Sequence, residues 1–134
     1  MDKNAVVVAY VQHQGKILLV RRSPLVRSFK QHWSIISGGI ESHESDPLQA
    51  VLRELEEEVG LSSSQLSLVK TMLPFEAEMA DKIRCIHPFL FESSTDVITL
   101  NWENTEYAWV APADLSKFVL VEGVDKLLEK LLSL

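Results

Sequence analysis

The sequence predicts an α/β or α+β fold, in which helices pack against one mixed β-sheet. Short segments rich in branched apolar residues, such as residues 5–11 and 16–22, indicate strands. Two amphipathic segments, residues 47–60 and 121–134, indicate helices. These elements do not alternate strictly, so we expect a mixed sheet rather than a wholly parallel one. The 134 residues, numbered 1–134, have the length of one domain, and no linker or repeat divides them.

The N-terminal third is predicted to contain two strands and a basic loop. Residues 5–11 read AVVVAYV and residues 16–22 read KILLVRR, with a polar turn between them. An irregular loop, residues 23–32, follows the second strand. A short apolar piece, residues 33–36, then leads into a Gly-Gly pair, where the backbone is able to turn sharply and approach a ligand closely.

The helix predicted over residues 47–60 has the clearest boundaries in the chain. Asp46 is a good N-cap, Pro47 fits the first helical position, and Gly60 supplies the stop. Apolar residues recur at helical spacing, namely Leu48, Val51, Leu52, Leu55 and Val59. We therefore expect one face of this helix to lie on the sheet.

The C-terminal half is predicted to add three strands, one short helical turn and a last helix. Two strands, residues 66–75 and 82–92, are joined near Ala80 and Asp81. Pro88 would block a ladder hydrogen bond, so we expect the second of these to be an edge or bulged strand. The remaining elements are a strand at 107–110, a helix or turn at 112–118 and the amphipathic helix at 121–134.

Composition excludes several classes of protein. There are 13 Lys and Arg against 19 Asp and Glu, a formal net charge of −6. An acidic chain lacks the basic field that nucleic-acid and membrane-surface binding need, so neither is expected as a partner. The lone cysteine, Cys85, has no partner for an internal disulfide and is expected to pack as a small apolar residue. No targeting segment is visible, which predicts a cytoplasmic location.

Three carboxylates of the helix at 47–60 share one face. At roughly 100° per residue, Glu54, Glu57 and Glu58 fall within an arc of about 100° beside the apolar stripe. A solvated helix face usually pairs Glu with Lys or Arg four residues on, but here Glu58 follows Glu54 at that spacing. A bound cation would turn this repulsion into attraction. Because all the candidate ligands are oxygens, Mg²⁺ is predicted, with Mn²⁺ as a second possibility.

Residues 33–61, WSIISGGIESHESDPLQAVLRELEEEVGL, resemble the Nudix box. The pattern of that box is Gly, five residues, Glu, seven residues, then Arg-Glu-U-x-Glu-Glu-x-Gly-U, where U is a bulky aliphatic residue. Its second half matches fully from Arg53 to Leu61, and Gly38 and Glu44 fit the first spacing. Eight residues instead of seven separate Glu44 from Arg53, and we place the extra residue at Asp46. A second register, starting from Gly39, would put Ser45 at the position of the glutamate.

The resemblance implies a Nudix fold, an α/β/α sandwich on a mixed sheet, and hydrolysis of a nucleoside diphosphate linked to another group. It further implies that Glu54, Glu57, Glu58 and the carbonyl group of Gly38 bind the metal. Arg53 would orient the Glu57 carboxylate, and an acid in the late loop, Glu103 or Glu106, would act as the base. Of these two acids, Glu103 is the slightly preferred candidate for the base.

The resemblance and the local charge also suggest substrate contacts. Arg21 or Arg22 would bind phosphate, and Glu44 is a further candidate in the substrate site. The expected partner is a small nucleotide-type diphosphate, and a homodimer is possible. The alternative is a non-catalytic module of the same fold that senses a nucleotide or binds a protein; such modules usually lose the acids that this chain keeps.

Overall fold

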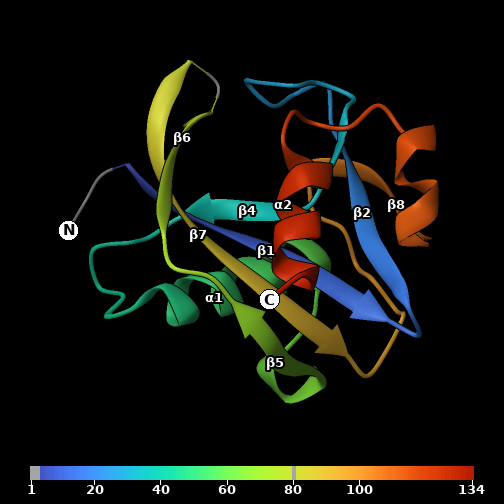
Figure 1. Ribbon diagram of the computed structural model, residues 1–134, viewed down its shortest axis with the longest axis horizontal. Coiled ribbons are helices and arrows are strands. Elements are labelled where there is room, and N and C mark those ends of the chain that lie inside the picture. Colours follow the sequence, from blue (N-terminus) through green and yellow to red (C-terminus); the bar gives the residue numbers. More distant parts are fainter. Residues whose placement is uncertain (1–3, 80) are drawn as a thin grey trace.

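The computed structural model describes residues 4–79 and 81–134, and within them an eight-stranded sheet is flanked by helices (Figure 1). The elements in chain order are β1 (Ala5–His13), β2 (Lys16–Arg22), β3 (Trp33–Ser34), β4 (Ile36–Gly39), α1 (Pro47–Val59), the 3₁₀ turn η1 (Ser63–Gln65), β5 (Leu66–Thr71), β6 (Phe75–Met79), β7 (Lys82–Ser93), β8 (Asn104–Val110), the 3₁₀ turn η2 (Pro112–Lys117) and α2 (Val124–Leu132).

Strand β1 lies at the centre of the sheet. Its first half pairs antiparallel with β4, where Val6 lies opposite Gly39, and it pairs parallel with β7 along its length. It meets β2 only at its end, where Gln12 lies opposite Ile17. Strand β2 pairs antiparallel with β3 and β8. One parallel pair among antiparallel ones makes the sheet mixed, and this confirms the predicted fold class.

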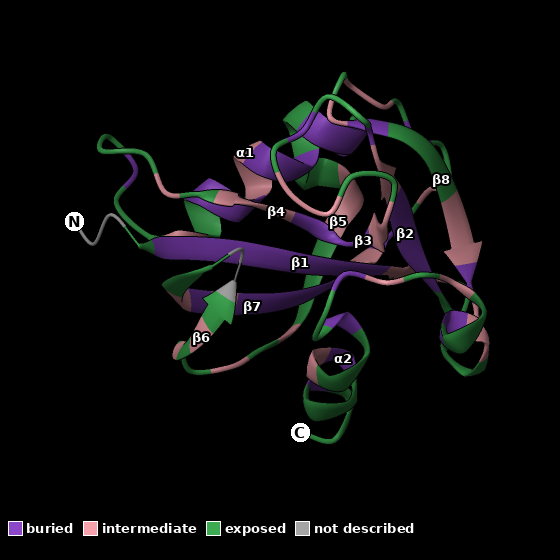
Figure 2. Cartoon of the chain, turned by 90° about the horizontal axis from the view of Figure 1, so that it is seen from above, coloured by how far each residue is buried: buried purple, intermediate pink, exposed green. Residues whose placement is uncertain are grey.

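Each face of the sheet carries one helix (Figure 2). Successive residues of a strand point to opposite faces, so β1 serves both cores. Its odd-numbered residues from Val7 to Val11 pack with α1, and its even-numbered residues from Val6 to Tyr10 pack with α2. The buried Tyr10 hydroxyl donates a hydrogen bond to the Val124 carbonyl, which attaches the start of α2 to β1. The α/β/α arrangement follows from this alternation.

The predicted boundaries of helix α1 are confirmed. The Asp46 carboxylate accepts a hydrogen bond from the Gln49 amide at 2.8 Å, as an N-cap does. Pro47 begins the helix, and Gly60 ends it with φ of 73°, in the left-handed region that glycine tolerates. The helix therefore starts and stops where its sequence signals lie, and its acidic face has a fixed direction relative to the sheet.

The strand predicted at 66–75 is wrong in its extent, because β5 ends at Thr71 and a separate strand, β6, begins at Phe75. Both pair antiparallel with β7, which has β1 on its other side, so the edge position expected for β7 is wrong. The pairing of β5 with β7 does contain a register shift, as the bulged alternative expected. Pro88 is tolerated because it faces the interruption between β5 and β6: its carbonyl accepts from the Thr71 hydroxyl and the Met72 amide there, and no ladder donor is needed at that point.

The last helix begins later than predicted. It spans Val124–Leu132 rather than residues 121–134, because Gly123 has φ of 91° and interrupts a helical path. Strand β8 begins earlier than its predicted start, and η2 confirms a short helical turn after Pro112. Cys85 lies half-buried on β7. None of the helices in the described part of the chain has the length and apolar character needed to cross a bilayer.

Candidate active site

Helix α1 carries the three predicted acids in different environments. Glu54 and Glu58 are buried, at 8 % and 4 % exposure, while the Glu57 side chain is 55 % exposed. Buried carboxylates are rare unless a partner compensates their lost hydration. The buried acidic pair lies at the border of the α1 core, with Glu57 at the solvent rim beside it. The face predicted from helical spacing therefore exists, and it is only partly solvated.

Strand β4 approaches α1 closely at Gly38. A Cβ atom at this position would overlap the carboxyl group of Glu54. At Gly39, by contrast, a Cβ atom would meet open space. The close approach requires glycine at the first of these positions alone. The backbone of β4 and the Glu54 carboxyl group thus form one small polar cradle.

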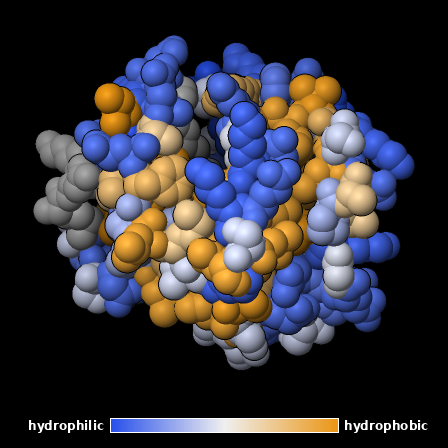
Figure 3. Space-filling view, viewed as in Figure 1, coloured by the Kyte–Doolittle hydropathy of each residue, from blue (hydrophilic) through white to orange (hydrophobic). Residues whose placement is uncertain are grey.

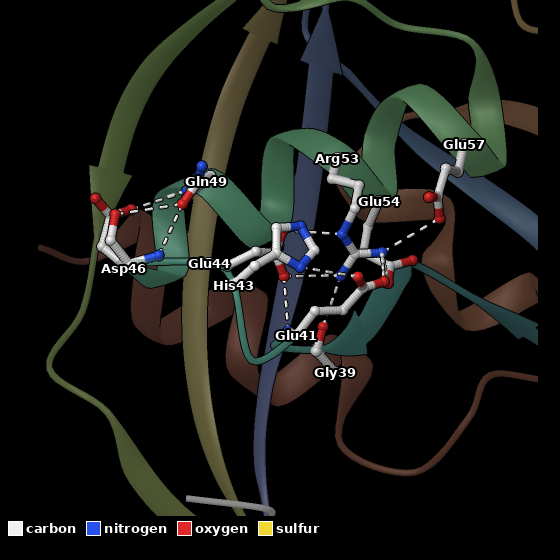
Figure 4. A network of polar contacts seen from close by, with 10 residues as sticks. Gly39, Glu41, His43, Glu44, Asp46, Gln49, Arg53, Glu54 and Glu57 are labelled. Carbon is white, nitrogen blue, oxygen red and sulfur yellow. Dashed lines mark hydrogen bonds and ion pairs between the residues drawn. The ribbon is translucent and has the colours of Figure 1, made fainter. Parts of the chain in front are cut away.

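Arg53 connects the acids to the loop before the helix (Figure 4). Its Nη1 donates to Glu54 Oε1 at 2.9 Å and to Glu57 Oε2 at 3.2 Å. Its Nη2 donates to the Gly39 carbonyl at 2.9 Å. A guanidinium group has a fixed planar fork of donors, so several contacts at once define its orientation. Arg53 therefore positions two of the predicted metal ligands relative to β4.

Glu44 lies on the other side of this guanidinium. Its side chain accepts from Arg53 Nε at 2.9 Å and from Arg53 Nη2 at 3.1 Å, and its Oε1 also accepts from the Glu41 amide at 2.7 Å. The residue is 3 % exposed. The hydrogen bond from Arg53 is the main reason that the pKa of Glu44 is lowered. Both carboxylate oxygens face protein groups rather than an open substrate site.

Glu58 is held in an environment that disfavours its ionised form. Burial, followed by contact with Glu54 and the charge of Glu103, raises the pKa of Glu58 to about 10, while the amide of Asn104 acts in the opposite direction. Glu58 Oε2 and Asn104 Nδ2 are buried, and neither atom meets hydrogen-bond geometry with any described residue. Burial also raises the pKa of Glu54. Glu58 therefore lacks full compensation among the described residues, whereas Arg53 compensates Glu54 in part.

The two late-loop acids are separated by the structure. Glu103 lies close enough to Glu58 for its charge to act on it, and the Glu103 amide donates to the Asn101 side chain at 3.0 Å. Glu106 lies on β8 and forms an exposed ion pair with Arg21 at 3.0 Å. Glu103 is thus brought to the acidic face, and Glu106 is turned to another partner.

The two arginines at the end of β2 also differ. Arg21 pairs with Glu106, as described above, and also donates to the Gln31 carbonyl. Arg22 donates from Nε to the Ser28 carbonyl at 2.9 Å and lines a pocket of about 270 Å³ that includes Gly38 and Gly39. Arg22 therefore lies beside β4, the glycine-bearing strand of the site, whereas Arg21 is ion-paired with β8.

Asn104 is a site residue that sequence reasoning missed. It is 5 % exposed and belongs to the segment Asn-Trp-Glu-Asn, which reads as an ordinary polar turn. Its burial follows from the start of β8, three residues earlier than the predicted strand. The one available signal was its place directly after Glu103. No pattern in the sequence pairs it with α1.

The acidic face has two features expected of a divalent-cation site. A third feature does not fit as the side chains stand, because Glu57 would have to reorient. The buried Oε2 of Glu58 has no partner among the described residues, and the Gly38 cradle would be filled by any side chain. Oxygen donors of this kind suit a hard cation. As the described side chains stand, however, no three His, Cys, Asp or Glu residues are grouped tightly enough to hold an ion. Glu57 is turned toward Arg53, so it would have to reorient to join Glu54 and Glu58.

The fold and the site define a hydrolase domain in which one acidic helix faces a glycine-bearing strand. Residues 1–131 match the family model described as NUDIX domain. The chain therefore belongs to the Nudix hydrolase family, whose members generally use divalent metal ions.

Relatives and solved structures agree with this assignment. The nucleoside triphosphatase NudI of Escherichia coli is 30 % identical over 132 residues, covering 90 % of each chain. The RNA pyrophosphohydrolase of Acidiphilium cryptum is 41 % identical over 64 residues, which are 48 % of this chain and 38 % of that protein. The NUDIX domain of Shewanella oneidensis NrtR, solved with ADP ribose, superposes with a TM-score of 0.78 at 20 % identity, covering 97 % of this chain and 86 % of that one.

Proposed function

We propose that the protein is a Mg²⁺-dependent pyrophosphohydrolase that cleaves the diphosphate linkage of a nucleoside diphosphate joined to another group. The observation that supports this most is the buried acidic pair Glu54 and Glu58 beside Gly38, in which Arg53 compensates Glu54 and the Oε2 atom of Glu58 has no partner among the described residues. A buried carboxylate pair that is only partly compensated is costly to the fold, and a cation would relieve that cost. The names of two curated relatives, an RNA pyrophosphohydrolase and a nucleoside triphosphatase, both denote hydrolysis of a phosphoanhydride bond.

The metal ligands of this proposal are the side chains of Glu54, Glu57 and Glu58 with the carbonyl group of Gly38. When bound there, Mg²⁺, or Mn²⁺ in its place, supplies charge neutralisation of the diphosphate and favours ionisation of the attacking water. Arg53, which donates to both acids, would keep Glu54 directed at the cradle, and Glu57 would have to leave Arg53 to join the ion. Glu44 then has a positioning role, because its carboxylate holds Arg53.

Glu103 is the base of this proposal. It lies at the acidic face and is half-buried, and its carboxylate is close enough to Glu58 to affect its ionisation. A carboxylate there would accept the proton of the water as the water attacks phosphorus in line with the leaving phosphate. Glu106 is assigned no catalytic part, since its carboxylate is paired with Arg21. Arg22 would contact a substrate phosphate from its pocket beside the glycines.

The test is hydrolysis of a panel of nucleoside triphosphates, nucleotide sugars and dinucleotides with Mg²⁺, with Mn²⁺ and with chelator. We expect metal-dependent release of phosphate, pyrophosphate or nucleoside monophosphate from one class. Glu57→Gln should lower kcat by at least a hundredfold while leaving the fold intact, because the side chain is exposed. Glu56→Gln is the matched control, since Glu56 is an exposed acid on the same helix and should retain activity.

The alternative is the non-catalytic nucleotide-binding module. Absence of turnover by folded wild-type protein across the whole panel, together with metal-independent nucleotide binding, would overturn the hydrolase proposal and support the module. Equal activity of the Glu57→Gln and Glu56→Gln variants would also contradict the assignment of Glu57.

A further inference from the structure

The pocket that Arg22 lines lies on the face of the sheet opposite α1. Side chains of β1 alternate, and Val6, which lines this pocket, belongs to the core on the α2 side. Gly39, opposite Val6 in the β1–β4 ladder, lines it as well. Figure 3 shows the molecule hollowed on this face, near the start of α2 and beside the β6–β7 hairpin. The acidic face and the pocket thus lie on the two sides of the glycine pair of β4.

The pocket carries two cationic groups in an acidic protein. Arg22 reaches it from β2, and Arg84 reaches it from β7, two residues before the buried Ile86 on the same face. Among the described residues, no carboxylate lies within ion-pair distance of either guanidinium, although Arg21 and Arg53 are both paired. Two unpaired like charges in one pocket repel each other, and a bound anion reverses that interaction.

The rest of the lining suits an anion rather than an aromatic base. The hydroxyl-bearing residues Ser28, Ser34 and Ser37 supply donors, and Phe29 is the single aromatic residue among the described residues that line the pocket. The volume of about 270 Å³ equals roughly nine water molecules. It lies below the usual range of about 300–1,000 Å³ for pockets that take a whole small-molecule ligand. A fragment of a substrate that includes a phosphate group fits this description.

We infer that this pocket binds a phosphate group of the substrate additional to the diphosphate at the acidic face, with Arg84 as a specificity-determining residue, an inference that rests on the proposed function. The Gly38–Gly39 pair leaves β4 without side chains between the two sites, so a substrate is able to pass over it. Guanidinium groups bind phosphate through two parallel hydrogen bonds, which favours arginine over other residues here.

The additional phosphate has two chemical sources, and paired substrates distinguish them. NADPH differs from NADH by one phosphate on a ribose, and ATP differs from ADP by one terminal phosphate. We expect kcat/KM to be at least tenfold higher for the phosphorylated member of one pair, and that pair identifies the source. Arg84→Met should reduce the preference to about threefold or less, and Arg84→Lys should restore part of it.

Arg27→Met is the matched control, because Arg27 is an exposed arginine of the neighbouring loop that does not line the pocket. It should retain the wild-type preference. An unchanged preference in Arg84→Met, or equal rates for both members of both pairs in the wild type, would overturn the inference.

A binding measurement separates failure of this inference from failure of the proposed function. Calorimetry with adenosine 2′,5′-bisphosphate against AMP, and with ADP against AMP, requires no turnover. Tighter binding of a doubly phosphorylated ligand, lost in Arg84→Met, supports the pocket even in a protein that hydrolyses nothing. Equal affinity within both pairs in an active enzyme would overturn the pocket and leave the hydrolase proposal intact.

Discussion

Arg53 shows how much of the site depends on one side chain. Its guanidinium contacts the helix acids on one side, the Gly39 carbonyl on another and Glu44 on a third. It is the partner that offsets part of the lost hydration of Glu54 and Glu44, because a buried carboxylate is stable only when it is hydrogen-bonded. Local changes around Arg53 should therefore act on stability and on activity to different degrees.

Glu44→Gln should lower stability in a pH-dependent way. The hydrogen bond from Arg53 lowers the pKa of Glu44 in the folded protein. The ionised residue therefore stabilises the fold above its unfolded pKa of about 4.3, and this contribution is lost as the pH falls through the lower folded value. At pH 7 we expect a loss of about 1–3 kcal/mol in urea unfolding. The difference from wild type should shrink below about pH 4.

Glu41→Gln is the control for that measurement. Glu41 also faces Arg53, at 3.4 Å, but its side chain is half exposed. An exposed ion pair contributes about 0–1 kcal/mol, so this variant should unfold close to wild type. Equal losses in the two variants, or a Glu44→Gln deficit that persists at pH 3, would contradict the role given to Glu44.

Gly38→Ala should damage activity more than stability. The added Cβ would overlap the far end of the flexible Glu54 side chain, which is able to swing aside, and the backbone is not in the left-handed region. We expect a cost of about 1 kcal/mol in unfolding. Displacing a metal ligand by about 1 Å should lower kcat/KM on the order of a hundredfold.

Gly39→Ala is the control for the stability measurement alone and should unfold as wild type, because a Cβ there meets open space. If Gly38→Ala keeps full activity, the close contact between β4 and α1 has no part in catalysis.

At the scale of single elements, α1 was predictable because its signals are local. The Asp46 cap, Pro47 and the left-handed Gly60 each act within one turn of the helix, so their effect does not depend on the rest of the fold. The arc that holds Glu54, Glu57 and Glu58 follows from helical geometry alone. Both the helix and its acidic face were therefore available from sequence.

Asp46→Ala should destabilise α1. The side chain accepts from the Gln49 amide at 2.8 Å, and removing this cap costs about 1 kcal/mol. For a domain of this size we expect the midpoint of thermal unfolding to fall by roughly 3–6 °C. Asp46→Asn keeps a capping oxygen and should lose less than half as much. Equal losses for the two variants would mean that the hydrogen bond is not the source of the effect.

The strands were less predictable because their limits depend on distant partners. Pro74, directly before β6, is a local signal for a break between β5 and β6, but the exact point depends on β7, which presents Pro88 there. In the same way, the pairing of Glu44 with Arg53 and the approach of Asn104 to Glu58 join segments whose contact only the tertiary fold determines. In the sequence Arg84 is one charge on a strand, and only the fold brings it to the pocket that Arg22 also lines.

At the scale of the whole molecule, metal binding should be linked to folding. A cation that binds only the folded chain stabilises it by mass action, by about 2.7 kcal/mol at a hundred times its Kd. We therefore expect saturating Mg²⁺ to raise the thermal unfolding midpoint on the order of 10 °C, and chelator to reverse the change. Glu54→Gln should abolish most of the shift, and Glu56→Gln should retain it. An unchanged midpoint across millimolar Mg²⁺ would contradict the proposed metal site.

The parallel pairing of β1 with β7 has a consequence for how the chain reaches its native state. Gln12 and Glu92 are neighbours in the sheet, yet 80 residues separate them along the chain. Contacts of such long range make folding slow, since the intervening chain must be closed into a loop before the contact forms. During synthesis, the apolar β1 segment emerges well before its main partner exists. Until β7 follows, one edge of this hydrophobic strand is unpaired, and such an edge is the kind of segment on which chaperones act and from which aggregation begins.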